Sequence, residues 1–249
     1  MPPASRPSNL TPKLHHEYFT ACFRSPGART LGNPGLEDEV RQVAEDPNFS
    51  IAGLSTGTVE ALGFLAPHLL CGEESAVHVF FRESRRSRKA QLAARTLLWQ
   101  VAGEEKVHEA MVSRLASMLP VAGGLAATRQ RGHDYFIGLA SADPAVHFAR
   151  VAALDSGVCK IMAALCASPA IVGCPTVQTM FVKIRSDEAR HVRISRKYVA
   201  DLGLSCQVLK GATEQVCPGL VTFLWPAGEA FEKLGIDSDR LFRHVKEEV

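Results

Sequence analysis

The chain has 249 residues, a mass of 27.0 kDa and a formal net charge of +2. Hydrophobic residues make up 46% and charged residues 22% of it, which is typical of a globular protein and excludes global disorder. The balanced charge argues against a nucleic-acid partner, and seven cysteines without a CxxC pair argue against a disulfide framework or a cysteine zinc site. Cysteine usage of this kind favours a cytoplasmic location. The longest uncharged stretch, residues 161–182, is interrupted by proline, so no membrane span is expected.

Apolar residues recur every three or four positions along most of the chain, and this period predicts an all-α protein. Residues 1–54 are expected to form an N-terminal lead-in with short helices, one of them at 36–44. Residues 55–249 are expected to form a helical domain. Four long helices are predicted in that domain, followed by two short C-terminal ones: 56–86, 90–118, 144–167, 176–202, 220–234 and 238–247.

The connections between the long helices predict how they are arranged. Short turns join the first helix to the second and the third to the fourth, which gives two antiparallel hairpins. Between the hairpins lies a long, glycine-containing connection, residues 121–143, which can run back along the whole bundle if it is extended. Two hairpins joined by one long crossover define the ferritin-like four-helix bundle, and this is the predicted fold.

Two Glu-x-x-His pairs carry the clearest chemical signal. His108 follows Glu105 by three residues, and His191 follows Glu188 by three. On a helix this spacing places a carboxylate and an imidazole on one face, where both can bind one metal ion. One pair falls in the middle of the second helix and the other in the middle of the fourth. These are corresponding positions of the two hairpins, so the sequence predicts a site for two metal ions.

The other helix of each hairpin is expected to supply one more carboxylate. Counting back 31 residues from Glu105 gives Glu74, and counting back 33 from Glu188 gives Asp155. The neighbouring Glu73 is the alternative to Glu74, and the hairpin spacing favours Glu74. Asp155 lies in an otherwise apolar stretch of its helix, and a metal ion would explain a buried charge there.

This donor set also indicates which metals suit the site. Four carboxylates balance the charge of two divalent cations in a buried cluster. Carboxylates with two imidazoles suit iron or manganese better than magnesium. An acid precedes each pair, Glu104 and Asp187, and each is expected to orient the imidazole of a neighbouring helix.

Together, these residues resemble the dinuclear-iron carboxylate proteins of ferritin-like fold. The resemblance covers about residues 60–202 and is most specific in the run Asp187-Glu188-Ala189-Arg190-His191. That superfamily includes bacterial multicomponent monooxygenases, the ribonucleotide reductase small subunit, aldehyde-deformylating oxygenases, arylamine N-oxygenases and a tRNA hydroxylase. This chain departs from it in having Asp155 where most members have Glu, and Ile184 where the arylamine N-oxygenases have an extra His.

The resemblance implies an enzyme with two iron ions that activates dioxygen, with manganese or a mixed pair as the alternative. The expected reaction is hydroxylation or N-oxygenation of a small organic substrate, with O2 as cosubstrate; the residues leave C–C cleavage open. No glycine-rich dinucleotide motif follows a strand, so electrons are expected from an external reductase or ferredoxin. A substrate cavity is expected near Phe81, Met111 and Val177. The alternative is a ferroxidase or peroxide-scavenging iron-handling protein, and a homodimer is left open.

Overall fold

The computed structural model describes residues 34–86, 92–120, 125–247 of the chain, and every regular element in these ranges is a helix. The prediction of an all-helical protein is therefore confirmed. The helix predicted at 36–44 is α2 (Pro34–Glu45), whereas any short helix before residue 34 lies outside the described residues. None of the described helices is long and apolar enough to cross a membrane.

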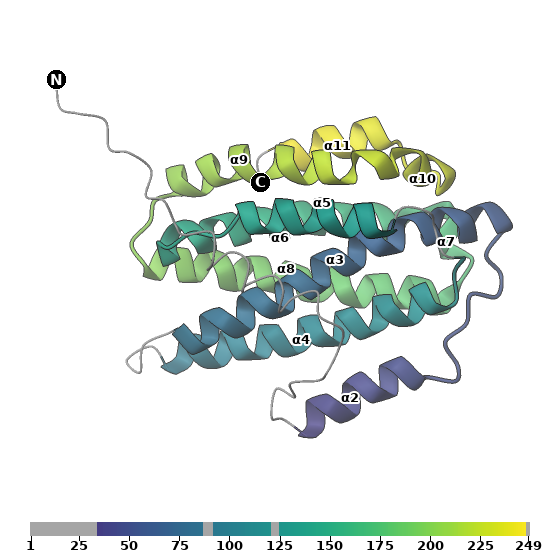
Figure 1. The fold of residues 1–249 in the computed structure, drawn as a ribbon, viewed down its shortest axis with the longest axis horizontal. Coiled ribbons are helices and arrows are strands. Elements are labelled where there is room, and N and C mark those ends of the chain that lie inside the picture. Colours follow the sequence, from purple (N-terminus) through teal and green to yellow (C-terminus); the bar gives the residue numbers. More distant parts are fainter. Residues whose placement is uncertain (1–33, 87–91, 121–124, 248–249) are drawn as a thin grey trace.

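Four long helices dominate the structure, and their bounds agree with the predicted ones to within about two residues. They are α3 (Thr56–Arg86), α4 (Leu92–Ser117), α6 (Pro144–Ala167) and α8 (Pro175–Asp201). Figure 1 shows α3 crossing beside α4, with α6 and α8 behind them. Among these four, the most extensive packing is of α3 on α4 and of α6 on α8, while α4 also contacts α8. Residues of the α3–α4 pair are thereby brought against residues of the α6–α8 pair.

The start of α6 shows how the sequence fixes a helix boundary. Asp143 is the N-cap, and its carboxylate accepts hydrogen bonds from the backbone N–H of Ala145, at 2.8 Å, and of Val146. Pro144 follows at the first helical position, where its missing N–H costs no hydrogen bond. The helix then buries most of its length and ends at Ser168, before Pro169. This fixed start sets which face of α6 carries Asp155.

The connection between the two helix pairs differs from the prediction, because part of it is helical. Residues Leu125–Gly138 form α5, whose 14 residues extend about 21 Å along the helix axis. Gly132 had suggested a flexible chain, but its role is close packing. A Cβ atom at this position would lie 3.1 Å from Cys71 Cβ of α3, so glycine lets α5 approach α3 closely. The side chain of Phe136 is buried on the same helix.

The C-terminal part of the chain also contains more helix than predicted. It forms α9 (Cys206–Leu224), a 3-10 turn (Trp225–Ala227), α10 (Gly228–Lys233) and α11 (Ser238–Lys246). A helix was predicted only from residue 220, whereas α9 begins at Cys206 and includes Pro218. α9 packs along α6, and α10 packs on α3. α5 and α9 also contact each other, so together they cover the space between α3 and α6. The short helix α7 (Pro169–Val172) links α6 to α8.

Candidate metal centre

Four buried side chains from three helices meet at the level where α4 crosses α8. Each offers one ligand atom, and these atoms all lie within 4.8 Å of one another. Every member is at most 4% exposed. The group consists of Glu73 on α3, Glu105 and His108 on α4, and Glu188 on α8. Glu105, His108 and Glu188 belong to the two Glu-x-x-His pairs, so a turn of α4 and a turn of α8 face each other here.

The carboxylate of Glu105 lies between two imidazoles. His108 Nδ1 lies 3.3 Å from its Oε2, and His191 Nδ1 lies 2.9 Å from its Oε1. Glu188 repeats this arrangement at longer range, with Oε1 3.7 Å from His108 Nδ1 and Oε2 3.9 Å from His191 Nδ1. Each of these two glutamates therefore presents one oxygen to each imidazole, and both stand between the same two ring nitrogens.

The outer nitrogen of each imidazole contacts an acid of the opposite helix. His108 Nε2 lies 3.1 Å from Asp187 Oδ2, and His191 Nε2 lies 2.8 Å from Glu104 Oε2. A carboxylate only accepts, so each Nε2 carries the hydrogen, and each Nδ1 is turned toward the buried carboxylates. The Arg190 guanidinium donates to Asp187, at 2.9 Å, and contacts Glu104 at 2.6 Å, which links the two orienting acids.

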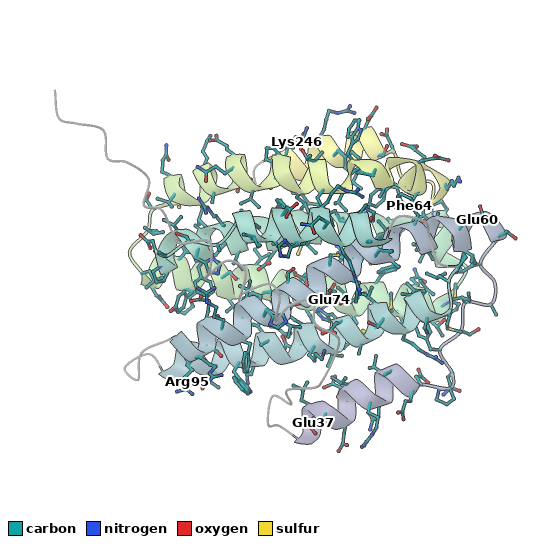
Figure 2. The ribbon with its side chains drawn as sticks, in the orientation of Figure 1. Glu37, Glu60, Phe64, Glu74, Arg95 and Lys246 are labelled. Carbon is teal, nitrogen blue, oxygen red and sulfur yellow. The ribbon has the colours of Figure 1, made fainter. Side chains whose placement is uncertain are left out.

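The α3 carboxylate that joins the group is Glu73, so the choice of Glu74 is corrected. Glu73 Oε2 lies 3.6 Å from His108 Nδ1. Glu74, which Figure 2 labels midway along α3, turns toward α5 instead, where its Oε1 lies 3.8 Å from Arg129. The hairpin count fixes the level along the helix, but successive helical residues point about 100° apart. The apolar stripe through Leu69 continues to position 73, four residues later, and this signal identifies Glu73.

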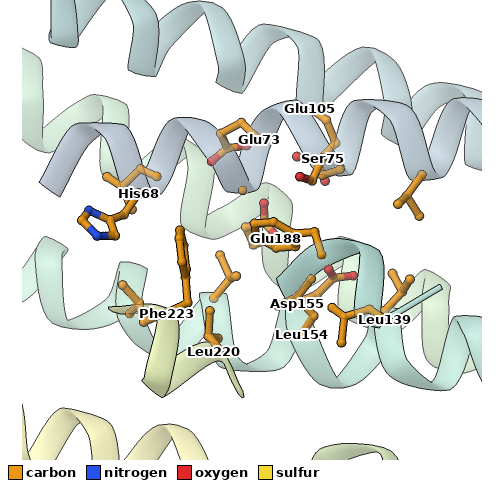
Figure 3. A pocket seen from close by; sticks show the side chains of 18 of the residues that line it. His68, Glu73, Ser75, Glu105, Leu139, Leu154, Asp155, Glu188, Leu220 and Phe223 are labelled. Atoms are coloured by element: carbon orange, nitrogen blue, oxygen red, sulfur yellow. The ribbon is translucent and has the colours of Figure 1, made fainter. Parts of the chain in front are cut away.

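Asp155 is buried close to this group but outside its 4.8 Å limit. It is 6% exposed, and its Oδ2 accepts a hydrogen bond from Ser195 of α8 at 3.4 Å. It lines the same cavity as Glu73, Glu105 and Glu188 (Figure 3). Sequence reasoning had not singled out Ser195, which is completely buried four residues after His191. A small hydroxyl residue on the buried face of α8 is the one signal that points to it.

Burial and mutual repulsion disfavour charge on most of these carboxyl groups. Burial raises the pKa of Glu73 to about 7 and that of Asp155 to about 8, and it raises the pKa of Glu188 well above its usual value. Burial acts the same way on Glu105, but the two imidazoles outweigh it and lower its pKa to about 2. Without metal, most carboxyl groups of the cluster therefore stay protonated, and this protonation lowers the negative charge that a metal ion would otherwise balance.

The imidazoles respond in the opposite direction. Burial alone lowers the pKa of a histidine, yet Glu105, Glu104 and Glu188 outweigh it and raise the pKa of His191 to about 10. Asp187, Glu105 and Glu73 likewise raise the pKa of His108 well above its usual value. Divalent cations can replace these protons, because cations satisfy the same carboxylates.

One buried pair of atoms tests whether the residues fit a metal ion. Glu105 Oε1 and His191 Nδ1 are fully buried and form an ion pair 2.9 Å apart, but neither atom has a partner with hydrogen-bond geometry among the described residues. Buried polar atoms of this kind normally have partners. A carboxylate oxygen and a ring nitrogen turned toward one point are a suitable donor pair for a metal such as iron or manganese.

A cavity of about 80 Å³ lies against the carboxylates. Apart from the acids, its walls are mostly apolar side chains of α3, α6 and α9, with Phe136 of α5. Figure 3 shows Glu73, Glu105, Asp155 and Glu188 around its middle and Phe223 toward one end.

The prediction placed an apolar cavity beside the metal level, lined partly by the first and fourth helices. The cavity does lie beside the carboxylates, and α3 and Glu188 of α8 contribute to its lining. The three residues named for it were wrong, because Phe81, Met111 and Val177 are not among the lining residues. Phe81 packs on Trp99, and Val177 belongs to the core. Most of the walls come from α3, α6 and α9 instead.

Comparisons with family models, with curated proteins and with solved structures return no match for this chain. The functional argument therefore depends on the geometry of the site.

Proposed function

We propose that this protein is a non-haem dinuclear-iron oxygenase that uses O2 to hydroxylate or N-oxygenate a small organic substrate. The observation that carries the proposal is the position of Glu105 and Glu188, each with one oxygen toward His108 and the other toward His191. Carboxylates placed between two imidazoles are suited to bridging two metal ions. We further propose that α3, α4, α6 and α8 form the four-helix bundle of the ferritin-like fold.

In the proposed site, the remaining residues would be divided between two metal ions. Glu73, which lies near His108, would help to hold one ion with it. Asp155, on which the charge of His191 acts, would help to hold the other ion with His191. Glu105 and Glu188 would contribute to holding both ions. When bound, iron would supply the activation of O2, which protein side chains cannot perform.

The chain's own residues would then provide orientation and a dry reaction space. Asp187 and Glu104 hold the Nε2–H groups of the two imidazoles, which leaves both Nδ1 atoms free to bind metal. The apolar walls on α3, α6 and α9 exclude water and admit an organic molecule beside the carboxylates. This adjacent cavity is the observation that favours an oxygenase over a ferroxidase, since a ferroxidase needs a path for iron and no organic pocket.

Metal loading and oxygen consumption test the proposal. Protein reconstituted anaerobically with ferrous iron should contain about two ions per chain, and each addition of O2 should oxidise about two equivalents before the reaction stops. Continued oxidation of hundreds of equivalents, with a soluble ferric core, would favour iron storage instead. One ion or none per chain would overturn the dinuclear site. Glu109→Ala is the matched control, because Glu109 lies one turn after Glu105 but pairs with Lys106.

A further inference from the structure

The cavity has a polar group away from the carboxylates that metal binding does not use. His68 lies on α3, five residues before Glu73, which corresponds to about 7.5 Å along the helix axis. Its side chain is 2% exposed and lines the cavity. Figure 3 shows it beside Phe223, and their ring centroids are 5.2 Å apart. This end of the cavity is otherwise lined by apolar groups such as Leu69 and Leu224.

The protonation state of His68 follows from its contacts. Nδ1 lies 3.2 Å from the backbone oxygen of Phe64. A carbonyl oxygen only accepts, so Nδ1 carries the hydrogen. Burial lowers the pKa of His68 to about 4, so the ring is neutral at pH 7 and Nε2 carries a lone pair. Nε2 is buried and has no hydrogen-bond partner among the described residues.

Because His68 Nε2 is an unpartnered acceptor in an apolar cavity, the cavity should favour ligands that carry a hydrogen-bond donor. Leaving such an atom unpaired costs about as much as a hydrogen bond contributes, and a bound group that donates to it removes this cost. A carboxylate or an ether cannot donate, and neither would be favoured here. A hydroxyl or a neutral N–H donates and carries no charge to desolvate.

We propose that His68 Nε2 anchors the substrate, which is a slender, largely apolar molecule with one hydroxyl or neutral N–H at its end. The spread of the lining residues supports the slender form. Those on α3 run from His68 to Phe80, about 18 Å along the helix axis. A molecule anchored at His68 presents an interior carbon, several bonds from its donor, to the carboxylates near Glu73. Oxidation at that carbon rests on the proposed function, whereas the anchoring does not.

The binding test uses two isomers in metal-free protein, n-octanol and n-heptyl methyl ether. They have the same formula and nearly the same shape, but only the alcohol donates. By calorimetry, the alcohol should bind the natural protein roughly three- to tenfold more tightly than the ether. In His68→Leu this ratio should fall to about one, while the affinity for the ether is retained. His78→Leu, a histidine substitution on the same helix outside the cavity, should leave the ratio unchanged.

A second measurement does not depend on any variant. In isotope-labelled protein, the nitrogen NMR resonance of His68 Nε2 should shift on binding n-octanol and stay in place on binding the ether, because only a donated hydrogen bond changes the lone pair. Purely structural loss in His68→Leu could not produce this shift. Equal affinities for the two isomers, or an unmoved Nε2 resonance, would overturn the anchoring role. So would loss of the ratio in His147→Leu instead of His68→Leu, since His147 also lines the cavity.

Failure of this inference and failure of the proposed function give different results. A His68-dependent preference for the alcohol in protein that binds no iron would support the anchor and count against the oxygenase. Oxygen-dependent turnover in iron-loaded protein with no His68-dependent preference would support the oxygenase and overturn the anchor. In iron-loaded protein, products of n-octanol should carry the new oxygen on an interior carbon, and oxidation at the carbon that bears the hydroxyl would contradict the proposed orientation.

Discussion

The α3–α4 half and the α6–α8 half of the site contain the same types of group but hold them differently. On the first half, the long side chain of Glu73 reaches to 3.6 Å from His108 Nδ1. On the second half, the shorter Asp155 accepts from Ser195 and stays outside the tight group. Glutamate has one more methylene than aspartate, so the second carboxylate cannot extend as far. A hydroxyl on the opposite helix occupies it instead.

The two orienting acids differ as well. Asp187, which contacts His108, is 14% exposed and also accepts from Lys183 at 3.0 Å and from Arg190 at 2.9 Å. Glu104, which contacts His191, is 31% exposed. The ring of His108 is therefore held by the more buried and more strongly paired acid. We infer that the two proposed metal positions would be unequal, and that the position near His108 would bind more tightly.

The largest expected effect comes from removing a ligand that both halves share. Glu105→Ala takes one carboxylate oxygen from each metal position, so metal content should fall from about two ions per chain to about none. Metal analysis after gel filtration measures this loss, and Glu109→Ala should keep both ions. Retention of one tightly bound ion in Glu105→Ala would show that the two positions do not share this residue.

Two neighbouring glutamates on α3 give the next test, because only one of them reaches the cluster. Glu73→Gln should reduce metal content to about one ion per chain, since it removes a donor from the His108 position alone. Glu74→Gln should bind as the natural protein does, because Glu74 faces Arg129 of α5. Circular dichroism would establish that both variants are folded. The opposite result, loss in Glu74→Gln only, would restore the choice made from hairpin spacing.

A substitution of Asp155 on the second half should change the free energy of unfolding in opposite directions without and with iron. Asp155→Asn removes a buried acid while keeping its shape, so the metal-free protein should unfold with a free energy higher by roughly 2 kcal/mol. Added iron should reverse this order, because ligand binding stabilises the natural protein more than the variant. Urea unfolding with and without iron measures both. An unchanged iron response in Asp155→Asn would exclude Asp155 as a ligand.

The orienting acids should give a smaller and unequal effect. Asp187→Asn and Glu104→Gln each leave the metal donors intact but loosen one imidazole, which typically lowers metal affinity tenfold to a hundredfold. We expect the loss of metal affinity to be near a hundredfold in Asp187→Asn and near tenfold in Glu104→Gln, because Asp187 is the more buried acid. Competition with a chelator gives the affinities. Equal losses would contradict the inferred inequality of the two positions.

The sequence predicts the long helices well because their signals are local. Prolines and caps fix their starts, as Asp143 and Pro144 do for α6, and apolar spacing fixes their faces. The sequence fails at α5 and at the start of α9, where tertiary contacts decide the conformation. Gly132, which belongs to the connection predicted as extended, packs against Cys71 from within α5, and α9 begins well before the predicted start at residue 220.

The sequence could predict at which height along the helices the site lies, but not fully which side chains point into it. Spacing along the hairpins correctly indicates which turns of α3 and α4 meet, and the structure brings Glu105, His108 and Glu188 together. It cannot separate Glu73 from Glu74, because one residue changes the level by only about 1.5 Å but the direction by about 100°. The contact of Ser195 with Asp155 joins residues 40 positions apart, so no local pattern contains it.

Each half also contributes one histidine to the cavity lining, His68 on α3 and His147 on α6, among apolar side chains such as Ile161 and Met162. Burial, aided by the charge of Arg131 on α5, lowers the pKa of His68 to about 4, while its hydrogen bond to the Phe64 carbonyl acts against this shift. This buried imidazole thus opposes protonation, in contrast to those of His108 and His191.

The smallest expected effect is the pH dependence that His68 adds to stability. In the unfolded chain its pKa is near 6.5, and in the folded protein it is about 4. The unfolded chain therefore takes up a proton first as the pH falls. The stability contributed by neutral His68 is complete above pH 6.5 and is lost progressively between pH 6.5 and 4. At pH 5.5 this loss should amount to about 1 kcal/mol.

Urea unfolding of metal-free protein at pH 7.5 and 5.5 measures this loss of stability. The decrease should be smaller by that amount in His68→Leu. An identical decrease in His68→Leu would show that His68 is already protonated in the folded protein, and its Nε2 would then be a donor instead of an acceptor.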